Sequence, residues 1–497
     1  KTIYNFKIYN YNKSMLKIIM EELLMFDNVK EECGVFGVYS NKPEKLAYMT
    51  CIGLSGLQHR GEESCGIAVN TDGVISYHKE PGLVSEVFTN EVLDNLPEGN
   101  MSIGHVRYST TGSAKRENAQ PIVIRHKKGN LAVVHNGNIT NAIELKQELE
   151  DNGAIFTTTS DTEVICHIIV RERLKAKSTE EAIANTMKVL KGSYSLIIMS
   201  PQKLIACRDP QGFRPLCMGK LGDDIVFASE SCALDICGAE FIRDVKPGEI
   251  VVVKDGKVKS IDYDSKEKKG MCVFEYIYFA RPDSILEGMS VHEFREKAGR
   301  FLATQMPVDA DIVAAVPDSG IDAALGYSKE SKIPYDLVFT KSKYIGRTFI
   351  QNTQNKRKKL VALKLNPLKN SIKGKRIVLI DDSIVRGNTL IGIIKTLRKA
   401  GAKEIHLRIA APAFIDICYF GTDIDSKENL IANGRTVEEI REIIGADTLE
   451  YLSIDNLKEI TKGCNIDDFC MGCFTGKYPI EVPKEIKKDR FEEKIQK

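Results

Sequence analysis

Short runs of alternating or continuous apolar residues dominate the chain up to about residue 265, and Gly, Asn or Asp interrupts them. Runs of this length with a two-residue period predict β-strands. Helical patterns occur at Thr140–Asn152 and at Thr162–Lys175, the second preceded by the candidate caps Ser160 and Asp161. Strands, then paired helices, then strands predict a layered α+β domain. The strands expected are Cys33–Tyr39, Gly66–Asn70, Leu131–His135, Ser195–Ser200 and Glu249–Lys254.

The pattern changes after a charged stretch at Asp262–Lys269, which we interpret as a linker. Apolar strands then alternate with helices, and this alternation predicts a parallel, doubly wound sheet. Ligands of such sheets bind at the carboxyl ends of the strands. The strands expected are Asp311–Val316, Arg376–Ile380 and Ile405–Ala411, with a helix at Asn388–Ala400.

Composition narrows the possible functions. A length of 497 residues suggests roughly two to four domains, and 43% hydrophobic with 28% charged residues is typical of a soluble globular protein. The net charge of +2 argues against general nucleic-acid binding. No apolar run approaches the roughly 18–20 residues of a membrane span. We therefore expect neither a nucleic acid nor a membrane as a partner.

The thirteen cysteines are an odd number in a long chain, and residues 1–32 lack the apolar core of a secretory signal. Disulfide frameworks belong mainly to small secreted proteins. We therefore expect a reducing, cytoplasmic compartment, in which clustered cysteines bind a metal or take part in catalysis.

Cys33 makes chemical sense as the first residue of a shortened chain. Its own α-amine, with an ordinary pKa of about 8, would then act as the base for the thiol. The alternative is a small buried hydrophobic residue, which is what most cysteines are.

The segment from Arg376 to Thr389 has the features of a phosphate site. A buried strand delivers Asp381 and Asp382 to the sheet edge, and a short loop then leads into a helix N-terminus that suits a phosphate. Gly387 permits a close approach of the backbone, and paired carboxylates suit ribose hydroxyls or Mg²⁺. An acidic turn that caps an ordinary helix is the alternative. The segment matches the phosphoribosyl-pyrophosphate (PRPP) signature of type I phosphoribosyltransferases.

A strongly basic run precedes this segment. Between Lys341 and Arg376 the sequence has twelve Lys or Arg and no Asp or Glu. A solvated face is the usual explanation of a charge run. Because this run lies beside a phosphate site, we interpret it as a flap that closes over a pyrophosphate.

Several separate motifs, in one order along the chain, resemble those of the amidophosphoribosyltransferases, the family of enzymes that opens purine synthesis. The resemblance runs from Cys33 to about Pro479. The motifs are Cys33–Gly37, Leu57–Gly61, Gly104–Tyr108, His135–Asn138, Ser160–Glu163, Phe274–Ser284 and the PRPP signature.

The resemblance implies two folds in one chain. The first is an α+β N-terminal nucleophile hydrolase, a four-layer αββα glutaminase domain of class II, at residues 33–265. The second is an α/β type I phosphoribosyltransferase domain at residues 266–480. Residues 1–32 would be a propeptide, removed autocatalytically, and residues 481–497 a charged tail.

In the first domain, the resemblance implies that Cys33 attacks the side-chain amide of glutamine to give a thioester and ammonia. The Asn136 amide and the Gly137 N–H would stabilise the oxyanion. Arg107 would bind the substrate carboxylate, and Asp161 its ammonium group.

In the second domain, the resemblance implies that ammonia displaces pyrophosphate from PRPP and gives phosphoribosylamine. Asp381 and Asp382 would serve ribose and Mg²⁺, with Ser319 joining the metal site, while Lys341 and Arg347 cover the pyrophosphate. The family is oligomeric, so a homo-oligomer (tetramer or dimer) is expected, and purine nucleotides inhibit it. The 5-phosphate would lie on Ser383, Arg386, Gly387, Asn388 and Thr389.

Cys470 and Cys473 form a CxxC motif. A subgroup of the resembled family carries a [4Fe–4S] cluster, and its ligands correspond to Cys272, Cys418, Cys470 and Cys473. Zinc could use four thiolates as well, so that alternative stays open. Cys464 is a further candidate ligand.

The chain departs from the family pattern at two places. Glu62–Cys65 replaces a commoner Gln-Glu-Gly-Ala, and Gly320 stands where a second Ser is frequent. Two alternative functions remain: a class II glutamine amidotransferase with another acceptor, such as glucosamine-phosphate synthase or asparagine synthetase, and a non-catalytic regulator that binds PRPP or nucleotides.

Overall fold

The computed structural model describes residues 33–108, 115–262, 268–341, 365–424 and 426–483, and the chain divides into two compact units. The described part of the larger unit comprises residues 33–297, 414–428 and 453–483. The smaller unit comprises residues 298–413 and 429–452, apart from the residues that are not described. The propeptide prediction for residues 1–32 lies outside the described residues.

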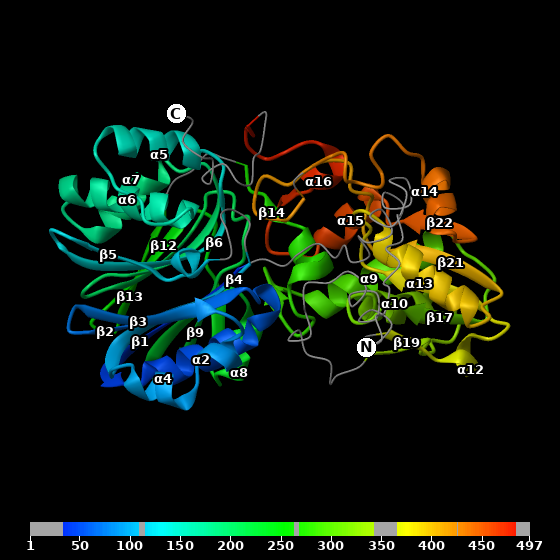
Figure 1. Ribbon diagram of the computed structural model, residues 1–497, viewed down its shortest axis with the longest axis horizontal. Coiled ribbons are helices and arrows are strands. Elements are labelled where there is room, and N and C mark those ends of the chain that lie inside the picture. Colours follow the sequence, from blue (N-terminus) through cyan, green and yellow to red (C-terminus); the bar gives the residue numbers. More distant parts are fainter. Residues whose placement is uncertain (1–32, 109–114, 263–267, 342–364, 425, 484–497) are drawn as a thin grey trace, which may run out of the picture. The chain divides into compact units, whose positions relative to one another are not determined.

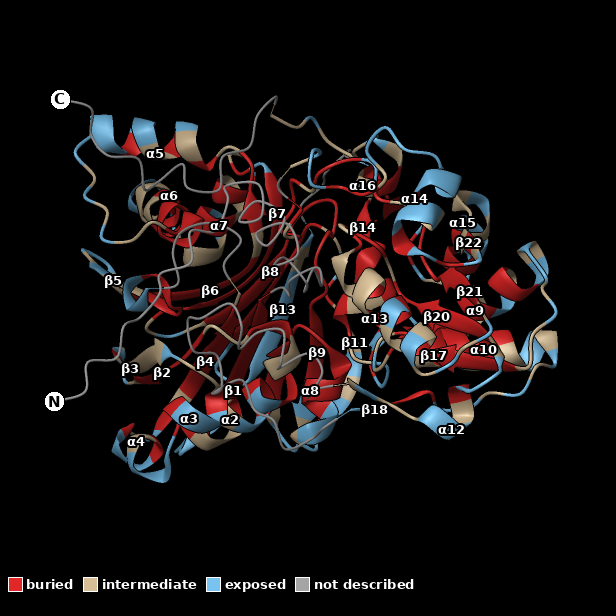
Figure 2. Ribbon diagram, turned by 45° about the vertical axis from the view of Figure 1, so that its right-hand side comes forward, coloured by how far each residue is buried: buried red, intermediate tan, exposed pale blue. Residues whose placement is uncertain are grey.

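Two antiparallel sheets form the centre of the larger unit, and most of their strands are buried (Figure 2). Within the described residues, one sheet has the strand order β11-β9-β10-β1-β4-β2-β3 and the other β13-β12-β8-β7-β6-β5. The strands of the first are β1 (Gly34–Glu44), β2 (Ser64–Thr71), β3 (Val74–Pro81), β4 (Gly99–Arg107), β9 (Cys217–Leu221), β10 (Asp224–Ala228) and β11 (Glu240–Asp244). Those of the second are β5 (Ile122–His126), β6 (Gly129–Ile139), β7 (Gly192–Met199), β8 (Leu204–Arg208), β12 (Glu249–Lys254) and β13 (Lys257–Asp262).

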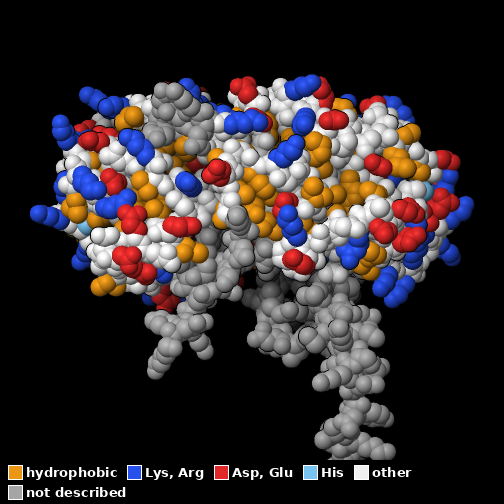
Figure 3. Space-filling model, turned by 90° about the horizontal axis from the view of Figure 1, so that it is seen from above, with side chains coloured by type: hydrophobic (Ala, Val, Ile, Leu, Met, Phe, Trp, Pro, Cys, Tyr) orange, Lys and Arg blue, Asp and Glu red, His pale blue; other side chains and the backbone are white. Residues whose placement is uncertain are grey.

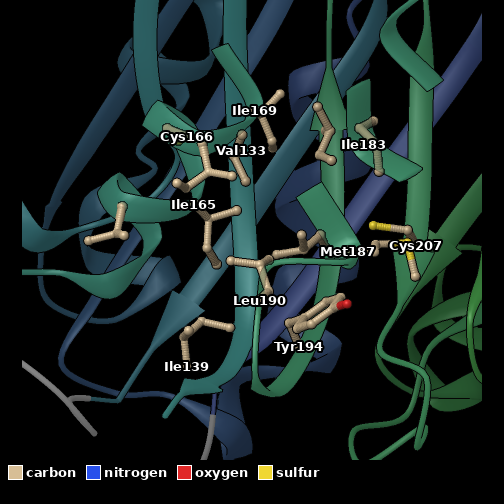
Figure 4. Packing of buried hydrophobic residues seen from close by; sticks show 14 of the residues in the cluster. Val133, Ile139, Ile165, Cys166, Ile169, Ile183, Met187, Leu190, Tyr194 and Cys207 are labelled. Atoms are coloured by element: carbon tan, nitrogen blue, oxygen red, sulfur yellow. The ribbon is translucent and has the colours of Figure 1, made fainter. Parts of the chain in front are cut away.

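Helices cover the outer face of each sheet, which gives four layers in the order αββα (Figure 1). On the second sheet, Ile165, Cys166 and Ile169 of α6 lie around Val133 of β6, and Met187 of α7 lies beside Cys207 of β8 (Figure 4). Because β7 is buried along its whole length, its sequence is continuously apolar or small rather than alternating. The helices are α2 (Leu46–Gly56), α3 (Val84–Val87), α4 (Asn90–Asn95) and α8 (Ser231–Ile236) beside the first sheet, and α5 (Ala142–Asp151), α6 (Asp161–Lys175) and α7 (Thr179–Met187) beside the second.

Segments from late in the chain join the larger unit. Strand β14 (Met271–Cys272) pairs in parallel with β23 (Phe469–Cys470), although nearly two hundred residues separate them in sequence. A π-helical turn at Glu275–Phe279 follows β14. The remaining elements of this region are β15 (Ile285–Leu286), β16 (Met289–Ser290), α15 (Ile454–Thr461), α16 (Gly472–Thr475) and α9 (Val291–Gln305), whose last turns belong to the smaller unit.

The smaller unit is built on a parallel sheet of strand order β17-β20-β21-β22 in the described residues. This confirms the parallel sheet predicted from the βαβ rhythm. Its strands are β17 (Ile312–Ala315), β20 (Arg376–Asp381), β21 (Glu404–Ile409) and β22 (Thr448–Tyr451), its helices are α10 (Ile321–Ser331), α12 (Lys369–Ile372), α13 (Asn388–Lys399) and α14 (Val437–Ile444), and β18 (Phe339–Lys341) pairs with β19 (Leu365–Pro367).

The surface agrees with a nearly neutral protein. On the face drawn in Figure 3, acidic, basic and hydrophobic side chains are interspersed. None of the helices in the described ranges is long and apolar enough to cross a membrane. The predicted domain limits at residues 265 and 480 stay a prediction, because the two units group residues by contact and not by function.

Candidate functional site

Cys33 lies at the end of the first sheet, directly before β1, with 7% of its surface exposed. The pairing of Gly34 with Val106 places it beside the end of β4. Its Sγ is 3.4 Å from the main-chain oxygen of Tyr108. Its own carbonyl oxygen accepts a hydrogen bond of 3.0 Å from Arg60 Nε. The thiol therefore occupies a fixed position next to Arg107, which is buried with 3% exposed.

Arg60 belongs to a buried network of charges. Its guanidinium lies 2.6 Å from Glu230 Oε1 and 2.9 Å from Glu275 Oε1. Burial by itself raises the pKa of a carboxyl group, but the charges of His59 and Arg60 outweigh it and hold the pKa of Glu230 well below its usual value. The carboxylate is therefore ionised at neutral pH, and Arg60 is held in place by two acids.

Asn136 and Gly137 lie in β6, on the second sheet. The Asn136 side chain is 1% exposed, and neither its nitrogen nor its oxygen has a hydrogen-bond partner among the described residues. A buried amide without partners costs about 1–3 kcal/mol, so a ligand that accepts from it recovers that energy. Gly137 has φ +144, and a Cβ there would lie 2.2 Å from Ser193 O, so only glycine fits.

A histidine bridge joins the two sheets near these residues. His105 of β4 is hydrogen-bonded through Nε2 to the carbonyl oxygen of His135 in β6, at 3.0 Å. Burial lowers the pKa of His105 to about 3, so the ring is neutral and donates from Nε2. This bridge brings the end of β4, with Arg107, close to the start of the Asn136–Gly137 segment.

Of the two candidate caps, Ser160 is the N-cap of α6 and accepts from the Thr162 N–H, whereas Asp161 is the first residue of the helix, one residue earlier than predicted. The Asp161 carboxylate accepts from the Ile139 N–H at 3.1 Å and lies 3.6 Å from His135 Nδ1. The structure thus gathers all five residues predicted for glutamine hydrolysis in one unit, at neighbouring strand and helix ends. Their roles stay predictions.

Asp381 and Asp382 lie at the carboxyl end of β20, each 7% exposed. The Asp382 N–H donates to Asp381 Oδ1 at 3.0 Å, and the Ser383 hydroxyl donates to Asp382 Oδ2 at 2.6 Å. Burial and the neighbouring Asp382 raise the pKa of Asp381 well above its usual value. An acid pair of this kind favours a cation between or beside its carboxylates.

The loop after these acids leads directly into α13. Gly387 has φ +87, and a Cβ there would lie 2.5 Å from Ile431 Cδ1. Asn388 and Thr389 form the first turn of the helix, whose N–H groups favour an anion. The residues predicted for the 5-phosphate, including Ser383 and Arg386, are therefore on one loop and one helix start.

The loop that carries Ser319 reaches the same sheet edge, because the Val316 N–H donates to Ile380 O at 2.8 Å. A Cβ at Gly320 would lie 2.5 Å from Ile380 O, so the backbone in this conformation has no room for a second Ser. Lys341 forms an ion pair with Asp318, beside a pocket that both residues line. Arg347 and most of the basic run lie outside the described residues.

The four predicted cluster cysteines converge on one small apolar pocket. Cys272 is paired in register with Cys470, and Cys418 and Cys473 line the same pocket. Cys464 does not line it, and its Sγ lies 3.9 Å from Met289 Sδ. The aromatic lining is Phe213, Phe274, Phe414, Phe420 and Tyr478.

These thiols are poor acids where they stand. Burial raises the pKa of Cys470 to about 12, and burial together with the three neighbouring sulfurs raises that of Cys473 well above its usual value. Thiolates here therefore need a positive group to stabilise them. All thirteen cysteines lie in the described ranges and none forms a disulfide. Within those ranges no three His, Cys, Asp or Glu side chains are placed to hold a single metal ion.

Sequence reasoning assigned no role to Arg60, Glu275, Arg214 or Ser193. Arg60 and Glu275 lie within motifs that were recognised, Leu57–Gly61 and Phe274–Ser284, so a signal was present for both. A buried arginine needs an acid partner, but sequence alone does not show which one. Nothing in the sequence singles out Ser193.

Comparison with known proteins agrees with both halves of the chain. Residues 105–235 match the family described as "Glutamine amidotransferase domain", and residues 290–413 match "Phosphoribosyl transferase domain". The amidophosphoribosyltransferase of Methanocaldococcus jannaschii is 49% identical over 465 residues, which are 90% of this chain and 98% of that protein. That of Bacillus subtilis is 45% identical over 459 residues, covering 91% and 95%.

A solved structure shares the whole fold. The glutamine phosphoribosylpyrophosphate amidotransferase from B. subtilis, complexed with ADP and GMP, matches with a TM-score of 0.84 and 43% identity. The match covers 91% of this chain and 98% of that one. The predicted combination of a glutaminase fold with a phosphoribosyltransferase fold is thereby confirmed.

Proposed function

Because this chain belongs to the amidophosphoribosyltransferase family, we propose that it transfers ammonia from glutamine to PRPP in the first committed step of purine (IMP) synthesis. The products are 5-phosphoribosylamine, glutamate and pyrophosphate. The observation that carries the proposal is the buried Asn136 amide, which has no partner in the described residues and lies in the unit that holds Cys33. An amide kept unpaired at such a cost suits a charge that arrives with the substrate.

In the glutaminase half, the Cys33 thiol loses its proton to its own α-amine and attacks the amide carbon of glutamine. This requires that the peptide bond between residues 32 and 33 is cut first. Asn136 and the Gly137 N–H hold the oxyanion, and the amide nitrogen leaves as ammonia with the proton returned to it. Water then cleaves the thioester to glutamate, while Arg107 and Asp161 hold the two ends of the amino acid.

In the phosphoribosyltransferase half, ammonia attacks the anomeric carbon of the ribose and the bond to pyrophosphate breaks. The loop from Ser383 to Thr389 holds the 5-phosphate on a helix start. Lys341, with Arg347 and the basic run, offsets charge on the leaving group. Bound Mg²⁺ would neutralise pyrophosphate, and the oxygen ligands that fit it are Asp381, Asp382 and Ser319.

We further propose that the four pocket cysteines hold a [4Fe–4S] cluster. Their burial and raised pKa values make thiolates costly unless iron binds them. In a cluster each thiolate binds a different iron, so the sulfurs need not surround one point as they must around zinc. We therefore propose the cluster, with zinc as the alternative that elemental analysis decides.

The regulation and setting follow the family. We propose that purine nucleotides inhibit the enzyme, which the ADP and GMP in the related B. subtilis structure support. A homo-oligomer and a cytoplasmic location complete the proposal. Thirteen thiols without a disulfide agree with a reducing compartment.

Two variants with opposite losses test the function. Cys33→Ala should abolish glutamine hydrolysis but keep pyrophosphate release from PRPP when ammonia is supplied. Asp382→Asn should lose pyrophosphate release with either nitrogen source and keep the basal hydrolysis of glutamine. Glutamine hydrolysis by Cys33→Ala, or an active enzyme whose N-terminus lies upstream of Cys33 by intact mass, would contradict the proposal.

Anaerobically purified wild-type enzyme tests the cluster. Four irons and four sulfides per chain are expected by elemental analysis. One zinc per chain, or no metal with full activity, would contradict the cluster. Another acceptor for ammonia would appear as glutamine hydrolysis that PRPP does not stimulate.

A further inference from the structure

We propose that Ser193 is a positioning residue for glutamine hydrolysis, whose hydroxyl fastens the oxyanion segment of β6 to the main chain at Phe420. The inference rests on the proposed function, because it assigns no new reaction. It adds that the segment 414–428, from late in the chain, holds the glutamine site in its active geometry.

The Ser193 hydroxyl accepts one hydrogen bond and donates another. It accepts from the Asn138 N–H at 2.9 Å and donates to the Phe420 carbonyl oxygen at 2.7 Å. A serine hydroxyl has one proton to donate, so this arrangement fixes its orientation. Ser193 is fully buried, and water does not compete for either bond. The Asn138 side chain adds a parallel bond of 2.8 Å to Tyr419 O.

The two hydrogen bonds of Ser193 act on β6 directly after Gly137, one of the two predicted oxyanion donors. Asn138 directly follows Gly137, whose φ of +144 is open to glycine alone and is not held by any side chain of its own. The segment 414–428 packs against Gly137, because a Cβ at Gly421 would lie 3.5 Å from the Gly137 carbonyl carbon. The direction of the Gly137–Asn138 peptide is therefore set from outside the strand.

The Phe420 carbonyl oxygen is also connected to Cys33 through a series of side-chain contacts. Arg214 donates to Phe420 O through Nε at 3.2 Å and through Nη2 at 2.5 Å. Its third nitrogen lies 3.2 Å from Glu275 Oε1, and Glu275 in turn holds Arg60. Arg60 then donates to the Cys33 carbonyl. The Phe420 carbonyl oxygen thus accepts from Ser193, which holds the peptide after Gly137, and from Arg214, the first residue of a series of contacts that ends at Cys33.

A Ser193 variant separates the contacts to the oxyanion donors from the contacts to Cys33. Without the Ser193 hydroxyl, Phe420 O still accepts from Arg214, so the contacts that lead through Glu275 and Arg60 to Cys33 persist. Only the hydrogen bonds between Asn138, Ser193 and Phe420 are lost. A displaced donor weakens transition-state binding more than substrate binding. The loss should therefore appear in kcat for glutamine and not in its KM.

The test uses the mature full-length enzyme, purified anaerobically, with PRPP and Mg²⁺ present. Ser193→Ala should lower kcat for glutamine hydrolysis about tenfold to a hundredfold, since removing one donor outright costs about 10²–10³. The KM for glutamine should stay within about twofold. Pyrophosphate release with added ammonia should be unchanged, and Ser193→Thr, which keeps the hydroxyl, should restore most of kcat.

Ser102→Ala is the matched control. Ser102 is an equally buried strand serine of the same unit, and its hydroxyl accepts from Thr50 at 2.7 Å. Its loss should leave both rates near those of the wild type. If Ser193→Ala does not fold, Ser193→Cys, which fills the space but bonds weakly, is judged by the same criteria.

Two results would overturn the inference: a wild-type kcat for glutamine in Ser193→Ala, or equal losses with glutamine and with ammonia. A Cys33→Ala enzyme serves as the reference in the same assay. If that enzyme still hydrolyses glutamine, the proposed function fails, and the result is distinct from a failure of Ser193 alone.

Discussion

Asn136 shows how an unsatisfied residue differs from a satisfied one of the same type. Both amide atoms of Asn136 lack partners in the described part of the chain, whereas Asn70, equally buried, donates to Ser200 O at 2.9 Å and accepts from the Gly73 N–H at 2.8 Å. One asparagine stabilises the fold, and the other is free to bind a substrate oxygen. Burial alone does not separate them, but hydrogen bonding does.

Asn136→Ala should therefore lower kcat for glutamine hydrolysis by about 10²–10³ without lowering the melting temperature. The matched variant Asn70→Ala should do the reverse, with a loss of about 1–3 kcal/mol in stability and an unchanged kcat. Steady-state kinetics and thermal unfolding of both proteins measure the contrast. Equal melting and equal kinetics in the two variants would refute the distinction.

At the scale of elements, the local pattern of apolar residues predicted the helices and strands. Contacts between segments far apart in sequence could not be predicted in this way. The strand at Glu249–Lys254 was predicted with its observed bounds, and β20 and α6 within one residue at each end. These elements carry their own period of apolar residues. The catalytic candidates Cys33 and Asp381 were found because motifs of neighbouring residues mark them.

Pairings between remote segments carry no such local signal. The register of Cys272 with Cys470 and the bonds of Ser193 to Phe420 depend on contacts that no periodicity encodes. The cysteines were grouped only through resemblance, and Ser193 was not found at all. Sequence therefore revealed the reacting groups better than the groups that hold them in place.

The bridge between β4 and β6 predicts a pH dependence of stability. The pKa of His105 falls from an ordinary 6.5 to about 3 on folding, chiefly through burial. Between these values the unfolded chain binds a proton that the folded protein does not, so the free energy of unfolding falls as the pH is lowered through this window. For one proton the slope is about 1.4 kcal/mol per pH unit.

His105→Gln removes this titration while keeping a donor for His135 O. The variant should lose stability less steeply than the wild type between pH 6.5 and pH 4, as measured by urea unfolding at several pH values. Measurements at pH 8, where His105 is neutral in both states, give the intrinsic cost of the change. Parallel pH profiles for the two proteins would rule out His105 as a source of the slope.

At the scale of the whole molecule, the larger unit is assembled from three separate stretches of chain. Residues 414–428 and 453–483 supply Phe420 O, the partner strand of β14 and the aromatic side chains around Phe213. The larger unit is therefore not a self-contained N-terminal piece of the chain.

A fragment of residues 33–297 should accordingly be insoluble, or melt well below the full chain. It exposes the ring of Phe213, which stacks on Phe420 at 4.1 Å, and leaves the buried Arg214 without its carbonyl acceptor. Far-UV circular dichroism and thermal melting of the purified fragment measure this. A soluble fragment that melts like the intact enzyme would show that the late segments are dispensable.

The dependence on Phe420 also orders events on the ribosome. Cys33 and β6 are synthesised early. The carbonyl groups of Tyr419 and Phe420, which accept from Ser193, Asn138 and Arg214, are synthesised only after the loop from Ser383 to Thr389. On the proposed role of Ser193, a nascent polypeptide cannot hydrolyse glutamine efficiently until the acceptor half has also been made. If Ser193 has this role, the order of translation would keep an unfinished enzyme from consuming glutamine.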